Sequence, residues 1–467
     1  MNELEVPVNI VGSTVFGRYP KISIEQTYNM IISDNWLVPY AGYKKVLNIS
    51  SNGQGRGIYH SSKANCLIIV IDNMVLTVNE NLGKHQVGSL NTYTGDVFIA
   101  ENDANQIAIS DLETIYIYNY STNVFTTAVL DFSPGYITFQ DGYFISPDIN
   151  RSQWRLSAPN DGTSWPATPN KVGGFQTKAG NPVATVSAPG KGGNLFVMGY
   201  SVTELWNDVG AQLFPYQRTT GFNIDYGCLS STTIAAGDDF IIWLAVNEKS
   251  GPVIMYSSGG QAQQISTDGI NFKLSQLKAP GESYGFIFKQ DGHLFYQISF
   301  VDPDDNLTLT YDFNTQKFFS LCDQNMNHHI AKRIAAFNNS YYFVSFIDGD
   351  LYELNSNYTT YDGLEFPRIR VCAAVKSADN NQFIANKLSL IIEQGMGVDR
   401  ADVKVSLSRD GGISFNNYIS MTLQPLANRM NKFSIWSLGL ANEIVPQFRF
   451  YGKDRFVVSN GLMTVQQ

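Results

Sequence analysis

The most regular feature of this 467-residue chain is a repeat of apolar strands separated by polar turns. The repeats begin at Gly55, Asp96, Gly135, Asn181, Gly227, Ser283 and His329, at intervals of 41, 39, 46, 46, 56 and 46 residues. A period of about 40 to 50 residues, with about four short strands in each unit, predicts an all-β fold of the β-propeller type. Seven blades are favoured, and the long step after Gly227 leaves six as the alternative.

Individual segments agree with this pattern. Residues 66–72 are almost continuously apolar, which predicts an inner strand covered on both faces. In residues 114–120, isoleucines alternate with tyrosines, as in a strand with two different faces. No segment of 12 or more residues shows good helical periodicity, so helix should be scarce. Turns are predicted at Asp72-Asn73, Asp141-Gly142, Asp291-Gly292 and Asp348-Gly349.

The repeat divides the chain into three parts. Residues 1–50 do not follow it and predict an N-terminal arm that supplies a ring-closing strand; Ile22, Ile24 and Gln26 alternate as in a strand. Residues 51–363 form the predicted propeller. Residues 364–467 contain five or six longer strand patterns and predict an appended β-sandwich.

The net charge, the cysteines and the hydropathy of the chain limit which kinds of partner it is expected to bind. The net charge is −9, from 32 basic and 41 acidic residues, and no long Lys/Arg run is present, which argues against tight nucleic-acid binding. The four cysteines are scattered and three lie in apolar strand patterns, so we expect buried free thiols and assembly in a reducing cytoplasm. The N-terminus shows no secretory signal, and no apolar run approaches the ~20 residues that span a bilayer. We therefore expect no membrane association.

Residues 408–415, SRDGGISF, fit an Asp-box, in which the Asp410 carboxylate caps the amides of a turn that contains Gly412. Asp-boxes occur in sialidase propellers, so a glycosidase is an alternative. A sialidase also requires three arginines around the sugar carboxylate, and the six arginines before the C-terminal part share no common blade position. The Asp-box therefore indicates a fold element.

No other pattern predicts catalysis or a cofactor. The five histidines show no metal-ligand spacing, and the adjacent His328 and His329 should point to opposite faces of a strand. Asp302, Asp304 and Asp305 indicate a loop in which a Ca²⁺ site is a minor alternative. No phosphate-binding loop, dinucleotide fingerprint or nucleophile elbow is present. We predict a protein that is not an enzyme and has no catalytic, cofactor or metal residues.

Several segments, in order, resemble the tail hub, or packaged-DNA stabilisation, proteins of short-tailed bacteriophages. The resemblance covers nearly the whole chain. The Thr27, Asn29, Pro39 and Gly42 pattern follows the family's N-terminal block only loosely, and Phe318 to Ser320 replace a usual Trp and basic residue. The residues that carry the resemblance are Glu204, Trp206, Phe214 and Pro215 in the first block; Trp243, Gly260 and Ser266 in the second; Gly292, His293 and Tyr296 in the third; and Asp410 and Gly412 in the C-terminal part.

The resemblance implies a structural virion protein, assembled in the host cytoplasm, that forms a ring of usually six subunits in the tail. Such a hub or nozzle lies below the portal and adaptor proteins, extends and seals the DNA channel, and anchors fibres or spikes with a needle or plug. Contact with double-stranded DNA would be transient and non-specific. The alternatives are a glycan-binding or sialidase-like propeller and a host-recognition protein at the tail tip.

Overall fold

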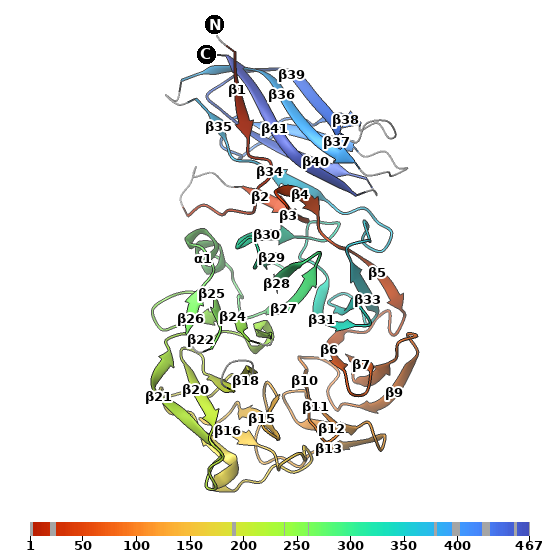
Figure 1. Ribbon diagram of the computed structural model, residues 1–467, viewed down its shortest axis with the longest axis vertical. Helices are drawn as coiled ribbons and strands as arrows, with labels where there is room; N and C mark the ends of the chain where they lie inside the picture. Colours follow the sequence, from red (N-terminus) through yellow and green to blue (C-terminus); the bar gives the residue numbers. More distant parts are fainter. Residues whose placement is uncertain are drawn as a thin grey trace.

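Seven small sheets surround a common axis, and a two-layered β-structure lies beyond one side of them (Figure 1). The computed structural model describes residues 3–18, 25–188, 193–237, 239–259, 261–377, 381–394, 402–422, 430–452 and 455–466. The predicted all-β fold, a propeller with an appended sandwich, is confirmed, and the propeller has seven blades.

Each of the first four blades is one antiparallel sheet built from a single continuous stretch of chain, with its strands in sequence order. Blade one contains β6 (Gly55–Ser61), β7 (Cys66–Ile71), β8 (Met74–Val78) and β9 (Lys84–Ser89). Blade two contains β10 (Phe98–Glu101), β11 (Gln106–Ser110), β12 (Ile115–Asn119) and β13 (Val124–Thr127). Blade three contains β14 (Thr138–Gln140), β15 (Tyr143–Asp148), β16 (Gln153–Leu156) and, after the 3-10 turn η1 (Pro169–Lys171), β17 (Val172–Gly174). Blade four contains β18 (Ala184–Ala188), β19 (Asn194–Met198), β20 (Thr203–Asp208) and β21 (Tyr216–Ile224).

The last three blades are less uniform. Blade five contains β22 (Gly227–Cys228), the 3-10 turn η2 (Ser231–Thr233), β23 (Ala235–Ala236), β24 (Ile241–Val246), β25 (Val253–Ser257) and β26 (Ala262–Gln264). Blade six contains β27 (Ser283–Gln290), β28 (His293–Phe300), β29 (Leu307–Asp312) and β30 (Lys317–Leu321). Blade seven contains β31 (Ala331–Phe337), β32 (Ser340–Ser345), β33 (Leu351–Asn355) and β5 (Gly42–Leu47). The α-helix α1 (Asp268–Ser275) lies between blades five and six and accounts for the long 56-residue step of the sequence repeat.

The sandwich combines strands from both ends of the chain. Its first sheet contains β3 (Met30–Ser33), β4 (Trp36–Pro39), β41 (Phe456–Gln466), β36 (Phe383–Gln394) and β39 (Met430–Ala441), with β1 (Glu3–Val8) paired to β41. Its second sheet contains β2 (Gln26–Tyr28), β34 (Arg368–Val371), β40 (Glu443–Tyr451), β37 (Asp402–Ser408) and β38 (Ile419–Thr422), with β35 (Val375–Lys376) paired to β40. The inner faces of the two sheets share one hydrophobic core.

The N-terminal residues connect the parts of the molecule instead of standing apart from them. Strand β1 pairs with β41, and β5 pairs with β33 to complete blade seven. Strand β2 lies between β30 of blade six and β34 of the sandwich, so the two parts form one ten-stranded sheet. The predicted strand alternation at Ile22 and Ile24 lies outside the described residues.

A fully buried arginine fixes this N-terminal segment against the sandwich. Arg370 of β34 forms an ion pair with Glu25 and donates hydrogen bonds to the passing backbone. Its other acceptors are Asn9 O (2.7 Å), Ile10 O (3.0 Å), Ser13 O (3.0 Å) and Thr27 Oγ1 (3.1 Å). Because a buried guanidinium is costly unless its donors are satisfied, these bonds hold the segment in one path.

Asn29 has a similar role where blade six meets the sandwich. It is fully buried with φ of 54°, a left-handed conformation that asparagine tolerates better than most residues. Its side chain accepts from Cys322 N (3.0 Å) and donates to Cys322 O (3.1 Å) and Pro367 O (2.7 Å). One side chain thus joins the N-terminal segment, the end of blade six and the start of the sandwich.

Aromatic rings fill the space between blades six and seven and the sandwich. We call this set the junction cluster: Tyr40, Tyr43, Phe288, Phe295, His329, Phe343, Tyr352, Tyr361 and Phe366. Tyr361 stacks on Phe366 with ring centroids 3.8 Å apart and on Tyr43 with centroids 4.3 Å apart. Burial lowers the pKa of His329 to about 3, so its imidazole is neutral at the centre of the cluster.

The predicted two-residue turns are present at Asp141-Gly142 and Asp291-Gly292, where all four residues have φ between 48° and 84°. Asp348-Gly349 is different, because β32 and β33 are joined by a longer loop, residues 346–350. There Asp348 accepts a hydrogen bond from the Tyr352 hydroxyl at 2.6 Å, and a Cβ on Gly349 would lie 2.4 Å from the Ile71 side chain. Glycine is needed at this position for close packing against blade one.

Candidate functional site

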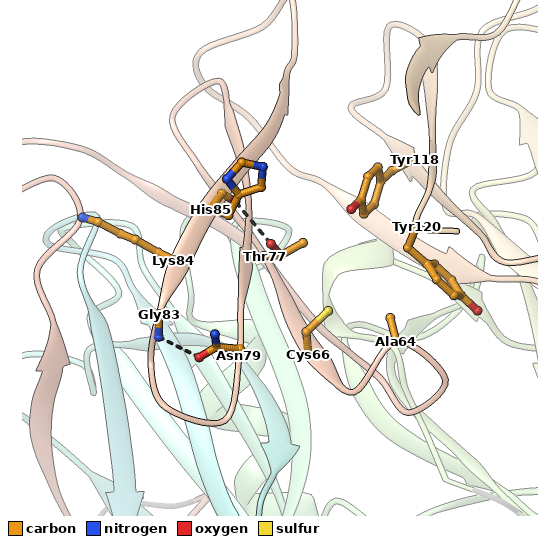
Figure 2. A pocket seen from close by; sticks show the side chains of 9 residues that line it. All are labelled: Ala64, Cys66, Thr77, Asn79, Gly83, Lys84, His85, Tyr118 and Tyr120. Atoms are coloured by element: carbon orange, nitrogen blue, oxygen red, sulfur yellow. Dashed lines mark hydrogen bonds between the residues drawn. The ribbon is translucent and has the colours of Figure 1, made fainter. Parts of the chain in front are cut away.

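A cleft of about 420 Å³ opens at the surface between blades one and two (Figure 2). Tyr118 and Tyr120 form one wall, and the hairpin between β8 and β9 forms the other. Cys66 lies between the two walls with its sulfur pointing into the gap. A cleft of this size could admit a small molecule only if its polar groups were available to bind it.

Several of these polar groups already form hydrogen bonds within the protein. Thr77 Oγ1 donates to His85 O at 3.3 Å, and Asn79 Oδ1 accepts from Gly83 N at 2.8 Å. Lys84 Nζ reaches away from the gap to Asn48 O at 2.7 Å. Burial raises the pKa of the Cys66 thiol, which favours the unreactive protonated form. The cleft thus contains no activated nucleophile among its described residues.

The innermost strands of the blades leave a cavity of about 140 Å³ near the propeller axis. Most of the residues that line it are apolar, and one arginine, Arg333 of β31, is among them. Arg333 Nη1 donates to Thr232 O at 2.8 Å and to Gly285 O at 3.2 Å, so the side chain joins blades five, six and seven. The other lining residues are Gly57, Ile58, Val97, Phe98, Ile99, Tyr136, Ile137 and Ile234.

Glu204 and Trp206 of β20 are both buried and belong to a compact cluster between blades three and four. The fully buried Glu204 carboxylate accepts hydrogen bonds from Gln176 N (2.7 Å), Thr177 N (2.5 Å) and Trp206 Nε1 (3.0 Å). Phe214 packs edge-on against Trp154, with ring centroids 5.3 Å apart, and Pro215 O accepts from Val209 N at 2.8 Å. Every one of these contacts stabilises blade packing.

The family model described as "Bacteriophage P22 Gp10, beta-propeller" matches residues 18–319 of the chain, which include blades one to five, most of blade six and the N-terminal strands β2 to β5. This chain belongs to the phage stabilisation family. It is therefore a member of a family of phage structural proteins, as the resemblance in its sequence indicated.

Solved structures similar to this member of the phage stabilisation family are distant. A catalytically inactive virginiamycin B lyase from Staphylococcus aureus, crystallised with quinupristin, has 12% identity and a TM-score of 0.47, over 68% of this chain and 99% of that chain. The extracellular domain of a putative hybrid two-component system from B. thetaiotaomicron has 12% identity and a TM-score of 0.46, over 85% of this chain and 47% of that chain. No curated protein sequence matches the chain.

The next family-motif residues make contacts within blade five and between blades five and six. Trp243 Nε1 donates to Gly227 O at 3.0 Å, and Tyr296 Oη donates to Thr233 O at 2.8 Å. Ser266 Oγ accepts from Ile254 N at 3.0 Å just before α1. Gly260, the other motif residue of this block, lies outside the described residues.

Gly292 and His293 open β28 beside the sandwich. Gly292 has φ of 84° in the turn, and His293 Nδ1 lies 3.0 Å from Asp312 Oδ2 while its Nε2 lies 3.2 Å from Ser33 Oγ. Hydroxyl, imidazole and carboxylate follow the order of a serine-hydrolase triad. Neither the inter-blade cleft nor the axial cavity reaches these groups, and Ser33 belongs to β3. These polar contacts therefore connect blade six to the sandwich.

The C-terminal motif is a tightly bonded turn. Asp410 accepts hydrogen bonds from the hydroxyls of Ser408 (2.6 Å) and Ser414 (2.5 Å) and from the backbone N–H groups of Ser414 (2.9 Å) and Ile413 (3.1 Å), and these bonds hold the pKa of the carboxyl well below its usual range. Gly412 has φ of 90° in this turn. The exposed tip carries Ile413, which is 81% accessible.

In the acidic loop that contains Asp302, Asp304 and Asp305, where a Ca²⁺ site was an alternative, the carboxylates of Asp304 and Asp305 bond neighbouring protein groups. Asp305 accepts from the backbone N–H groups of Lys278 (2.7 Å) and Ala279 (2.8 Å), and Asp304 pairs with Lys278 Nζ at 2.6 Å. Within the described part of the chain, no group of three His, Cys, Asp or Glu side chains could hold a metal ion. All four cysteines are buried and free, as expected.

Sequence reasoning missed the residues that join the two parts of the molecule, above all Arg370 and Asn29. A signal was present, because Arg368 and Arg370 interrupt the apolar strand RIRV, where a charge needs a buried partner. That signal gives no indication of which distant segment provides the partner.

No helix of the described residues is long and apolar enough to cross a membrane.

Proposed function

We propose that this protein is a non-enzymatic structural subunit of the phage tail. Several copies, six by resemblance, form a ring below the portal and adaptor proteins that extends the DNA channel, retains packaged DNA and anchors fibres or spikes. The observation that carries the proposal is the family match over residues 18–319. The site geometry supports it, because the described family-motif residues contribute to packing and capping contacts.

The axial cavity supports a channel formed between copies instead of through one propeller. Its volume is about 140 Å³, and Arg333 lines it. A compact space of about 140 Å³ is only about 5 Å across, whereas the major groove of duplex DNA is alone wide enough to admit an α-helix, so the duplex cannot pass through it. The DNA path would then be lined by surfaces of several subunits.

Charge supports passage without tight binding. The chain has a net charge of −9, and like charges on the wall and on the phosphates oppose condensation of DNA on the channel. Contacts with the DNA would be transient and independent of its sequence. The charged content of only 16% also suits large permanent interfaces between subunits.

The test is assembly of the purified chain with portal–adaptor complexes, followed by electron microscopy and native mass spectrometry. A closed ring of copies at the portal exit is the expected result. A stable monomer that ignores these complexes and binds oligosaccharides would contradict the proposal and favour the glycan-binding alternative. DNA retention is then measured as nuclease protection of packaged DNA with and without this protein.

A further inference from the structure

The first sheet of the sandwich ends in two strands that differ in chemistry. Among the described residues, β1 pairs with β41 alone and β39 pairs with β36 alone, so each has no strand on its other side, although the Arg409 side chain already bonds Leu438 O of β39. Figure 1 shows β1 and β39 on opposite sides of β41 and β36. Unpaired edges of this length are templates for another strand unless they are protected.

The edge formed by β1 is acidic. Glu3 and Glu5 are exposed, Leu4 is 59% accessible, and Pro7 removes one backbone donor near the end of the strand. Two copies of this edge would place glutamates against glutamates. The edge is thereby protected from pairing with itself.

The edge formed by β39 is basic and apolar. Lys432 is exposed, and Trp436 (65% accessible) and Leu440 (55% accessible) lie on the outer face of the sheet. Lys387 Nζ stands 4.5 Å from the Trp436 ring centroid, and Arg409 donates a hydrogen bond to Leu438 O. Positive charge and exposed apolar surface therefore accompany this edge.

Strand direction also fits a junction between the two edges. The order β1, β41, β36, β39 is antiparallel at every step, so β1 and β39 run in opposite directions. If a second copy is placed beside the first in the same orientation, its β1 lies antiparallel to β39 of the first. The extended sheet then keeps the antiparallel pattern.

We propose that β39 of one subunit pairs with β1 of a second copy of this chain, with Glu3 and Glu5 facing Lys432 and its neighbours. Such a contact joins two different surfaces, and head-to-tail contacts of this kind close into rings when the rotation allows. The inference rests on the ring in the proposed function and identifies the surface that builds it.

Cysteine pairs test the contact directly. Within one chain β1 and β39 are separated by three strand spacings, about 14 Å, which exceeds the reach of a disulfide, about 7 Å between Cα atoms. Glu5→Cys is combined in turn with Lys432→Cys, Ser434→Cys and Trp436→Cys, because the register between copies is the unknown. At least one combination should give a ladder of linked oligomers on a non-reducing gel, whereas Glu5→Cys alone should give dimers at most. The four native cysteines are buried and should not react.

Charge reversal provides the second test. Lys432→Glu alone, or Glu3→Lys with Glu5→Lys, should reduce the ring fraction at least ten-fold, and the combination of all three should restore it. Lys317→Glu, at an exposed lysine of blade six, is the matched control and should leave assembly unchanged.

The outcomes separate this inference from the proposed function. Wild-type rings that persist in every charge variant, with no linked ladder, overturn the edge pairing and leave the tail function standing. Rings linked through these edges that fail to engage portal complexes support the pairing and overturn the function. A wild-type chain that remains monomeric at high concentration and with portal complexes overturns both.

Discussion

Blades one to four and the junction of blades six and seven with the sandwich are built by opposite strategies. Each of the first four blades takes all its strands from one stretch of chain, so its contacts are local. The junction takes strands from both ends of the chain and joins them through β2, β5, Arg370 and Asn29. Repeated local strand pairing forms the first four blades. At the junction, the hydrogen bonds of the buried Arg370 and Asn29 side chains determine where the N-terminal segment attaches to blade six and the sandwich.

The comparison changes how the N-terminal segment is to be tested. If residues 1–15 are an arm that serves intersubunit contacts, their deletion should impair ring assembly without unfolding the propeller. In this structure the deletion would also remove Asn9, Ile10 and Ser13, which bind the buried guanidinium of Arg370. Assembly experiments therefore need the edge substitutions in β1 instead of the whole deletion.

The largest effect is expected at Arg370. Arg370→Met removes one partner of a buried ion pair and leaves Glu25 and three carbonyls without their donor, so the free energy of unfolding should fall by about 3–5 kcal/mol. Urea denaturation measures this change, and limited proteolysis should cut the chain within residues 3–18. Arg56→Met is the matched control, because Arg56 is equally buried but bonds only within blade one and to Gly95 and Thr92. Equal cleavage of both variants would contradict a specific attachment of the N-terminus.

Asn29 should give the next largest effect. Asn29→Ala leaves buried groups of Cys322 and Pro367 unpaired and places alanine at φ of 54°, for a loss of about 3 kcal/mol in unfolding free energy. Asn29→Gly makes the same deletion without the left-handed strain and should lose about 1 kcal/mol less. If the two variants are equally stable, backbone conformation does not contribute at this site.

Within the blades, Glu204→Gln should have a smaller effect. The shape of the side chain is preserved, but charge-assisted hydrogen bonds to two backbone N–H groups and to Trp206 become neutral, which should cost about 1–2 kcal/mol. Denaturation followed by tryptophan fluorescence measures this loss. The N-terminal segment should remain resistant to protease, and its release would show that blade four and the junction are coupled.

The smallest effect is a pH dependence from the junction cluster. The pKa of His329 is about 3 in the folded protein, below its ordinary value of 6.5, so the unfolded chain takes up a proton first as the pH falls. Stability is complete above pH 6.5 and declines between pH 6.5 and about 3, by up to about 1.4 kcal/mol per pH unit. Between pH 7 and pH 5.5, the wild type should lose about 1 kcal/mol more than His329→Gln. His85→Gln, on the exposed part of β9, should behave as the wild type.

The local part of the fold could be predicted because its signals are local. Strand and turn patterns placed the first strands of blades one, five and six at Gly55, Gly227 and Ser283, where β6, β22 and β27 begin. The family motif identifies residues such as Glu204 in the sequence but does not predict what they contact. The groups that bond Glu204, the backbone of Gln176 and Thr177, lie in the connection between blades three and four, far from Glu204 in the chain. The pairing of Glu3 with Gln466 could not be predicted at all, since an alternating pattern specifies a face and not a partner.

The pairing of β1 with β41 has a consequence for the timing of biosynthesis. Strand β1 leaves the ribosome long before its partner strand β41, because the whole propeller and most of the sandwich lie between them in the chain. At about 5 to 20 residues per second, β1 waits roughly 20 to 90 s for that partner, and β5 waits for most of this time for β33. During this interval the early blades can fold while β1 and β5 still lack their partner strands. Newly made chains in the crowded cell therefore pass through a vulnerable period that ends only when β41 has been made.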